Sequence, residues 1–300
     1  MNDLAIRSPN EARELVEEVI YRAEGVFLWV TLVIASLLSG LRNRDDILVL
    51  LKRLERLPPQ LELLYDHMLS FVEPEYIVEA SKTFQIFRAY NDFGSLYLER
   101  LYNALTADLP LIRGQSDEEL KKARKGPVRL LELAPNIKAN QILFYEPESL
   151  YEHMEIKLRT NCGGLLEIQR WRESDTVSYI HRTARDYIER HDVWAKLMVH
   201  VASIEPDFEP NASLLMSSVL DVKHHSLRDL PDAERLRRNL SSIWHDALRF
   251  AKRIETINPS IKIQLIHEFD RAATTLYKRA NGNEENGPSE LPHWSSYLDF

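Results

Sequence analysis

The sequence contains little cysteine and little glycine. Its 300 residues include a single cysteine, Cys162, and nine glycines. One cysteine cannot form an internal disulfide, and so few glycines leave little room for an all-β fold built on tight turns. The first residues also lack a basic segment followed by an apolar one, so no secretory leader is expected. We therefore expect a mainly α-helical protein with the cytoplasm as its default location.

Catalytic and metal-binding motifs are missing as well. No glycine is followed by Lys-Ser or Lys-Thr, the ending of the phosphate-binding loop, and neither G-x-S-x-G nor H-E-x-x-H occurs. One cysteine cannot build a structural zinc site alone. The side chains of His224 and His225 would point about 100° apart on a helix, so they do not converge on a metal ion. A solvated helix end is the favoured interpretation of this pair. We expect no enzyme, no catalytic residue and no metal site.

The formal charge of −8, from 46 acidic and 38 basic residues, argues against a nucleic-acid partner, because binding a polyanion needs a net basic face. One basic stretch, "SDEELKKARKGPVR" at residues 116–129, could serve a nucleic-acid-binding winged helix. Its three acidic residues weaken that alternative. No nucleic-acid binding is expected.

One long uncharged run stands out, from Gly25 to Leu41. As a helix its seventeen residues would span roughly 26 Å, which is short of the ~30 Å hydrocarbon core of a membrane. Amphipathic patterns precede it, from Pro9 to Ala23, and follow it, from Ile47 to Leu57, and both need an apolar surface to cover. The run is therefore expected to form the buried centre of a helical bundle. Another helix could approach it closely on the side that carries its small residues, Ala35, Ser36, Ser39 and Gly40. Membrane attachment through residues 25–41 is the alternative.

Breaks in the pattern divide the chain into units. Residues 1–73 are predicted to form a helical bundle, and residues 74–194 a winged-helix-like module. Within that module the period changes in "LLEIQR" and "VSYIHR", which predicts a β-hairpin near residues 164–182. Residues 195–280 are predicted to form a C-terminal helical domain, and residues 281–300 a polar loop with an aromatic tail. The expected fold class is mainly α, with multi-helix bundles and one short hairpin.

The segment "YIHRTARDYIER" carries the most specific candidate site. His181 and Arg182 follow the second predicted strand, and Arg185 falls in the first turn of the next helix, where free backbone N–H groups favour an anion. These three side chains could contact a phosphate group. The alternative is that Arg182–Asp186 and Arg185–Glu189 form i,i+4 ion pairs, with His181 a strand-end residue whose hydrogen bonds are satisfied.

The sequence also resembles a known family. "ELVEEVIYRAEGVFLWVTLVIASLLSGLRN" resembles the helix pair that closes the nucleotide-binding module of fungal NACHT-type STAND proteins, which include heterokaryon-incompatibility and innate-immune regulators. "LPPQLELLYDHMLSFVEPEYIVEASKTFQIFRAY" resembles the next two helices of that family. "CGGLLEIQR" with "VSYIHRTARDYIE" resembles the hairpin and final helix of the winged-helix part of this family, and "DFEPNASLLMSSVLDVK" and "WHDALRFAKRIE" resemble the helical segment that follows. The resemblance covers nearly the whole chain.

The resemblance implies a regulatory role without catalysis. In NACHT proteins a winged-helix histidine contacts the diphosphate of ADP and holds the closed state, and the matching residue here is His181, with Arg182 and Arg185 as nearby candidates. The phosphate-binding loop is missing from the sequence, so ADP or ATP is expected only with a NACHT domain in cis or trans. The chain would be a truncated member, a gene-model fragment or a stand-alone regulatory piece. A helical scaffold for protein partners is the further alternative.

Overall fold

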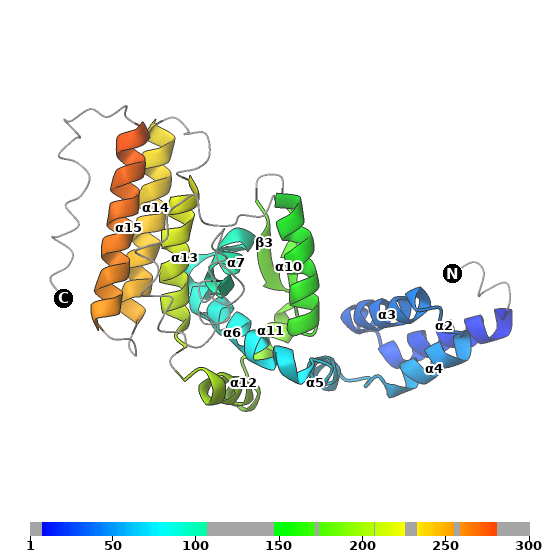
Figure 1. Ribbon diagram of the computed structural model, residues 1–300. Helices are drawn as coiled ribbons and strands as arrows, with labels where there is room; N and C mark the ends of the chain where they lie inside the picture. Colours follow the sequence, from blue (N-terminus) through cyan, green and yellow to red (C-terminus); the bar gives the residue numbers. More distant parts are fainter. Residues whose placement is uncertain are drawn as a thin grey trace, which may run out of the picture.

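The protein is mainly helical. A computed structural model describes residues 8–106, 147–171, 174–206, 208–225, 233–254 and 259–280. Within them, twelve α-helices accompany one short 3-10 helix and one small antiparallel sheet of three strands, as the sequence predicted for the fold class (Figure 1). In chain order the elements are α2 (Pro9–Ala23), α3 (Phe27–Arg42), α4 (Ile47–Arg56), α5 (Leu61–Ser70), α6 (Pro74–Tyr90), η1 (Asn91–Phe93), β1 (Leu96–Tyr97), α7 (Leu98–Thr106), α10 (Pro147–Asn161), β2 (Leu166–Gln169), β3 (Thr176–Tyr179), α11 (Arg182–Ile188), α12 (His191–Ile204), α13 (Pro210–His225), α14 (Ala233–Arg253) and α15 (Pro259–Ala280).

Helices α2, α3 and α4 pack around a small core of their own at one end of the molecule (Figure 1). Trp29 and Val33 of α3 and Leu54 of α4 are fully buried in it. The indole Nε1 of Trp29 donates a hydrogen bond to the Pro58 carbonyl at 2.7 Å, just beyond the end of α4. The Arg22 guanidinium donates to the Leu54 carbonyl and, at 3.3 Å, to that of Leu57. These donors bond carbonyl groups in the last turn of α4 and just beyond it, and so tie α2 and α3 to the end of α4.

Helix α3 is buried on one face only. Trp29, Val33, Leu37 and Gly40 face the core, but Phe27 is 88% exposed, and Ile34 and Leu38 are 43% and 37% exposed. The prediction that this run forms the buried centre of a bundle therefore holds for one face only, because α2 and α4, which pack against it among the described elements, leave these side chains exposed. Among the helices that the structure describes, none has the length and apolar character needed to cross a membrane.

Gly40 is the one buried position among the small residues of α3, since Ser36 is half-buried. A Cβ atom at Gly40 would lie 2.7 Å from Leu50 Cδ2 and 2.8 Å from Asp45 Oδ2. Ala35 and Ser39, by contrast, are exposed. The predicted close contact is thus present at one position, where α4 and the loop before it cross α3.

The centre of the molecule has the connectivity of a winged helix. The described elements run α6, β1, α7, α10, β2, β3 and then α11, and the sheet order is β1-β3-β2. Leu166 of β2 pairs with Tyr179, and Leu96 of β1 pairs with Val177. The hairpin lies within the predicted range, and β1 adds a third strand that the sequence pattern did not predict. It forms because β3 has a free edge that two residues before α7 can join.

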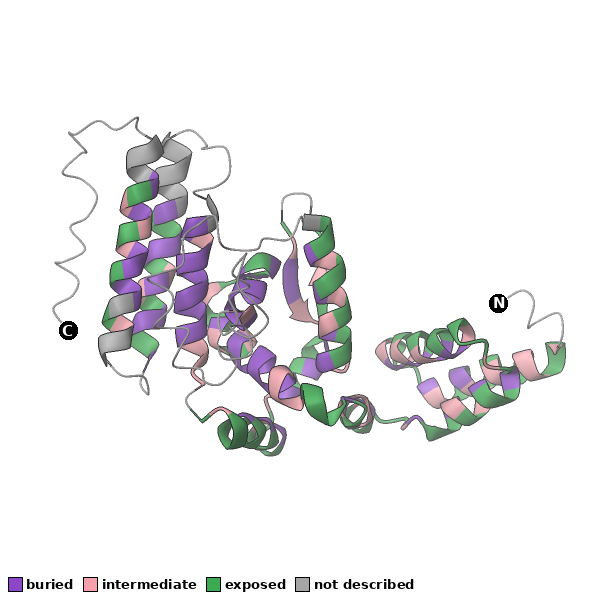
Figure 2. Ribbon diagram, viewed as in Figure 1, coloured by how far each residue is buried: buried purple, intermediate pink, exposed green. Residues whose placement is uncertain are grey.

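Helices α13, α14 and α15 form a bundle at the other end. Helix α13 is buried along most of its length, with α14 and α15 on one side and the winged helix on the other (Figure 2). One hydrophobic core runs from Tyr65 through the winged helix to Leu276 of α15. The domain boundaries inferred from the sequence stay predictions. The basic stretch 116–129, and residues 281–300, for which a polar loop with an aromatic tail is expected, lie outside the described residues.

Candidate functional site

His181 lies at the junction between the hairpin and α11. Strand β3 ends at Tyr179, and the backbone N–H of Ile180 donates to the Leu165 carbonyl at 3.2 Å, which holds the exit of the strand against the start of β2. The backbone of His181 is extended, and its imidazole is exposed. The residue is the N-cap of α11, a position from which a side chain can accept a bond from the first turn.

Thr183 holds the imidazole through two contacts. Its Nδ1 accepts the backbone N–H of Thr183 at 3.2 Å and lies 2.9 Å from the Thr183 hydroxyl. The next two amides, of Ala184 and Arg185, donate to the His181 carbonyl at 3.1 and 3.3 Å. Three of the backbone N–H groups that this turn was expected to offer an anion are therefore already bonded to the cap residue.

Both arginines form the local ion pairs of the alternative interpretation. The Arg182 Nε lies 3.7 Å from Asp186 Oδ2, and the Arg185 Nε lies 3.1 Å from Glu189 Oε1. The side chain of Arg182 is 87% exposed, so its pair contributes little to stability and leaves the guanidinium accessible. His181 and Arg182 thus lie side by side at the surface, while Arg185 is directed along α11 toward Glu189.

Three polar contacts join α5 to α11 and to the residues just beyond it. The Tyr65 hydroxyl lies 2.7 Å from the Thr183 hydroxyl, and the Tyr187 hydroxyl donates to Asp66 Oδ1 at 2.9 Å. A third contact, at 2.7 Å, joins Glu62 to Arg190 just past the end of α11. Sequence reasoning missed all three. The spacing of Glu62, Tyr65 and Asp66 on one side of α5 is compatible with such a contact, but nothing in the sequence identifies its partner.

The hydroxyl groups of both tyrosines at this contact are held in the neutral form. Tyr65 is fully buried, and this burial raises the pKa of its hydroxyl. Burial, followed by the hydrogen bond to Asp66, raises the pKa of Tyr187. Their rings lie 5.5 Å apart and are tilted by 48°. The contact between α5 and α11 therefore combines aromatic packing with directed hydrogen bonds, which sets the rotation of α5 relative to α11.

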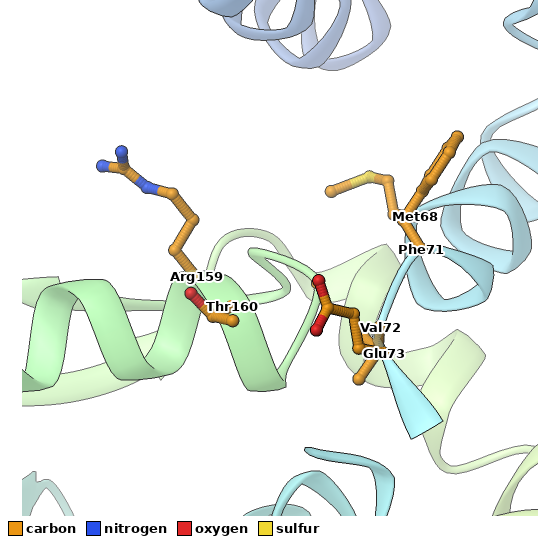
Figure 3. Close-up of a pocket in the computed structure, with 7 residues that line it drawn as sticks. Met68, Phe71, Val72, Glu73, Arg159 and Thr160 are labelled. Atoms are coloured by element: carbon orange, nitrogen blue, oxygen red, sulfur yellow. The ribbon is translucent and has the colours of Figure 1, made fainter. Parts of the chain in front are cut away.

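A shallow hollow of about 290 Å³ lies where α5, α6 and the end of α10 meet (Figure 3). Its apolar lining includes Met68, Phe71 and Val72, with Glu73 and Arg159 at its rim. Figure 3 shows the Arg159 guanidinium directed away from the Glu73 carboxylate, and it pairs instead with Glu155 on its own helix. The hollow thus holds no convergent set of polar groups. Within the described residues, no group of three His, Cys, Asp or Glu side chains could hold a metal ion.

Comparison with known proteins places the chain in a family. The domain of unknown function DUF7791 matches residues 71–231, which is more than half of the chain. The match begins one residue after α5, and it takes in the hairpin, His181, α11, α12 and α13. The chain therefore belongs to the DUF7791 family. No curated protein and no solved structure matches it.

Proposed function

We propose that this protein is a non-catalytic regulatory region that couples the nucleotide state of an adjoining NACHT-type NTPase domain to opening and to contacts with protein partners. The single observation that carries the proposal is the position of His181. Its exposed imidazole lies between the hairpin and α11 of the winged helix. Helix α11 is hydrogen-bonded to α5, which follows the N-terminal helices. A ligand at His181 would thus act at the point where the two parts of the chain meet.

Donor chemistry at this position is compatible with a nucleotide phosphate. Nδ1 of His181 is occupied by Thr183, and within the parts of the chain that the structure describes Nε2 has no hydrogen-bond partner. The neighbouring Arg182 guanidinium adds a largely exposed cation. Both groups suit an anionic oxygen. These two side chains alone would hold a phosphate weakly, so the base, sugar and metal ion of a nucleotide would be bound by the NTPase domain.

The N-terminal helices offer a surface for that domain. Large apolar side chains are exposed on each of them, including Ile20 of α2 at 67%, Phe27 of α3 at 88% and Leu48 of α4 at 61%. Exposed apolar side chains can become buried when another domain packs against them. A regulatory region that closes on a nucleotide-binding domain needs such a surface in addition to its ligand contact. The partner is therefore proposed to be a NACHT domain, in cis or in trans.

The test uses both the chain and a full-length relative. The purified chain is expected to show no ATP turnover and no thermal shift with ADP. His181→Ala in a full-length relative should speed ADP release or raise signalling, because one phosphate contact is lost. His191→Ala, at an exposed histidine that begins α12, is the matched control and should leave ADP release unchanged. Measurable ATP hydrolysis by the chain alone, or equal effects of the two substitutions, would contradict the proposal.

A second candidate function is a helical scaffold for protein partners without a nucleotide. It is favoured by the exposed apolar side chains of α3, Phe27, Ile34 and Leu38. In this case the surface would bind a partner constitutively. Binding to a NACHT domain measured with and without ADP separates the two functions, because only the regulatory function gives an affinity that depends on the nucleotide. Phe27→Asp should weaken binding under both, and Trp171→Asp, at an exposed site in the hairpin loop, should not.

A further inference from the structure

A chain of three side chains connects the fully buried hydroxyl of Tyr65 to the exposed ring of His181. Tyr65 Oη lies 2.7 Å from Thr183 Oγ1, and Thr183 Oγ1 lies 2.9 Å from His181 Nδ1. A hydroxyl can donate or accept, and either ring nitrogen of a neutral imidazole can carry the proton. The distances alone therefore leave the direction of each bond open.

One obligatory donor sets the direction of the whole chain. The backbone N–H of Thr183 also points at His181 Nδ1, at 3.2 Å, and a backbone N–H can only donate. Nδ1 must then be unprotonated. The single hydroxyl proton of Thr183 consequently goes to Nδ1, and the proton shared with Tyr65 must come from the tyrosine. The proton of the neutral imidazole is left on Nε2, which is the nitrogen without a partner among the described residues.

We infer that Thr183 and Tyr65 are positioning residues for His181, which hold its neutral ring as the Nε2–H tautomer and make its outer nitrogen a hydrogen-bond donor. All the bonds then run in one direction, from Tyr65 through Thr183 and the imidazole to the surface. The ligand that completes such a chain is an acceptor oxygen, such as that of a phosphate or carboxylate. A ligand that presents only a donor to Nε2–H, or a metal ion bound through Nδ1, does not fit.

The common direction also couples the outer ligand to the contact between α5 and α11. Hydrogen bonds aligned head to tail polarise one another, by roughly 10–30% per bond. An acceptor on Nε2–H makes Nδ1 a better acceptor, which strengthens the bond from Thr183 and, through it, the bond from Tyr65. Ligand binding at His181 is thereby linked to the docking of α5. This inference rests on the proposed function for the identity of the ligand, but the tautomer follows from the contacts alone.

The tautomer can be measured directly on the free chain. In a histidine-labelled sample, two-bond ¹H–¹⁵N correlation spectra distinguish protonated from unprotonated nitrogens in each of the ten imidazoles. His181→Gln assigns the relevant signals. We expect an unprotonated Nδ1 and a protonated Nε2 for His181 in the neutral form. A protonated Nδ1 would overturn the inference without any need for a variant.

Variants test the two positioning residues. Thr183→Val keeps the shape and the backbone N–H but removes the hydroxyl donor, so the His181 signals should shift part of the way toward a mixture of tautomers, and Thr183→Ser should restore them. Tyr65→Phe should move the same signals less, and Tyr97→Phe, at a tyrosine that is 48% exposed, should not move them. Signals unchanged by Thr183→Val would contradict the role of Thr183, and signals unchanged by Tyr65→Phe would contradict that of Tyr65.

This experiment and the test of the proposed function fail separately. The spectra contain no nucleotide, so an Nε2–H tautomer together with an ADP release rate that ignores His181→Ala would leave the positioning role standing and remove the regulatory function. A protonated Nδ1 together with altered ADP release would do the reverse. In the second case His181 would contact the nucleotide in some other protonation state, and Tyr65 would have only a packing role.

Discussion

The guanidinium Nη1 of Arg100 lies 2.6 Å from Asp246 Oδ2, and this ion pair joins the winged helix to the C-terminal bundle. Arg100 belongs to α7 and is only 7% exposed, and its Nε lies 3.3 Å from Asp221 of α13. The Tyr90 hydroxyl of α6 accepts from the same guanidinium at 3.2 Å. Burial by itself lowers the pKa of Arg100, but Asp221, Tyr90 and Asp246 together raise it above its usual value.

Removal of this arginine should be strongly destabilising. Arg100→Met leaves two carboxylates beside each other without their cation, and breaking a buried ion pair in this way costs about 3–5 kcal/mol. Arg253→Met is the matched control, because the Arg253–Asp92 pair is exposed at 44% and 70% and should contribute less than about 1 kcal/mol. Urea denaturation of both variants measures the difference. Equal midpoints would show that the buried cluster contributes nothing specific.

Adjacent glycines after α10 should tolerate alanine unequally. Gly163 and Gly164 have φ angles of +59° and +73°, so alanine at either pays for a left-handed backbone, about 1–2 kcal/mol. Only at Gly163 would the new Cβ also lie 2.9 Å from the carbonyl oxygen of Met68, whereas at Gly164 its nearest neighbour is the Met68 methyl group at 3.9 Å.

Gly163→Ala should therefore destabilise the protein by roughly 1–3 kcal/mol more than Gly164→Ala, because backbone must move to relieve the overlap. Thermal unfolding followed by circular dichroism is a sufficient measurement. The same loss in both variants would mean that the end of α5 moves freely away from α10, and the close approach of these two helices would then carry no energetic weight.

Cys162 should be unreactive in the folded protein. Its side chain is fully buried, and burial, together with the Glu79 carboxylate, raises the pKa of the thiol to about 12 from 9.0. The thiolate is the reactive form, so a thiol reagent at pH 9 should modify the protein only when it unfolds. Modification rates measured with increasing urea should follow the unfolded fraction. Rapid modification without denaturant would contradict this burial.

The same thiol should make stability depend on alkaline pH. The unfolded chain loses the thiol proton near pH 9, while the folded chain keeps it to about pH 12, so the unfolded state is favoured as pH rises between these values. The contribution is fully present below pH 9 and reaches at most about 4 kcal/mol, from about 1.4 kcal/mol per pKa unit. Cys162→Ala should flatten the fall in stability over this range relative to the wild type, and parallel curves would exclude the effect.

Tyr187→Phe should loosen the contact between α5 and α11. The Tyr187 hydroxyl donates to Asp66 at 2.9 Å, and a hydrogen bond to a charged group contributes about 1.5–3 kcal/mol when it is well shielded. Asp66 is exposed and can be rehydrated, so the expected loss is nearer 1 kcal/mol. Hydrogen exchange of the α5 amides should speed up, and Tyr76→Phe, at a tyrosine that is 36% exposed, should leave it unchanged.

Much of the secondary structure could be predicted because its causes are local. Proline occupies the first position of α2 and α6, and Gly163 and Gly164 take the left-handed conformation that ends α10. The change from helical to alternating period located the hairpin. The ion pairs from Arg182 to Asp186 and from Arg185 to Glu189 also followed from spacing alone, because residues four apart share a helix face.

The tertiary structure decided the rest, because it depends on residues that are distant in sequence. Strand β1 exists only because the edge of β3 is available, and a lone pair of residues carries no periodicity. Phe27 and Ile34 are exposed because α2 and α4 cover only one face of α3. The sequence of α3 is apolar on every face, so it could not indicate which face is covered.

The candidate site shows the same division. The sequence by itself determined that His181 stands between a strand and a helix, since the pattern on either side of it changes within a few residues. Only the folded chain brings Tyr65 to Thr183, across 118 positions, and so decides which nitrogen of His181 accepts and which faces outward. A hydrogen bond is directional and short, and no periodicity in the sequence encodes which distant donor will meet it.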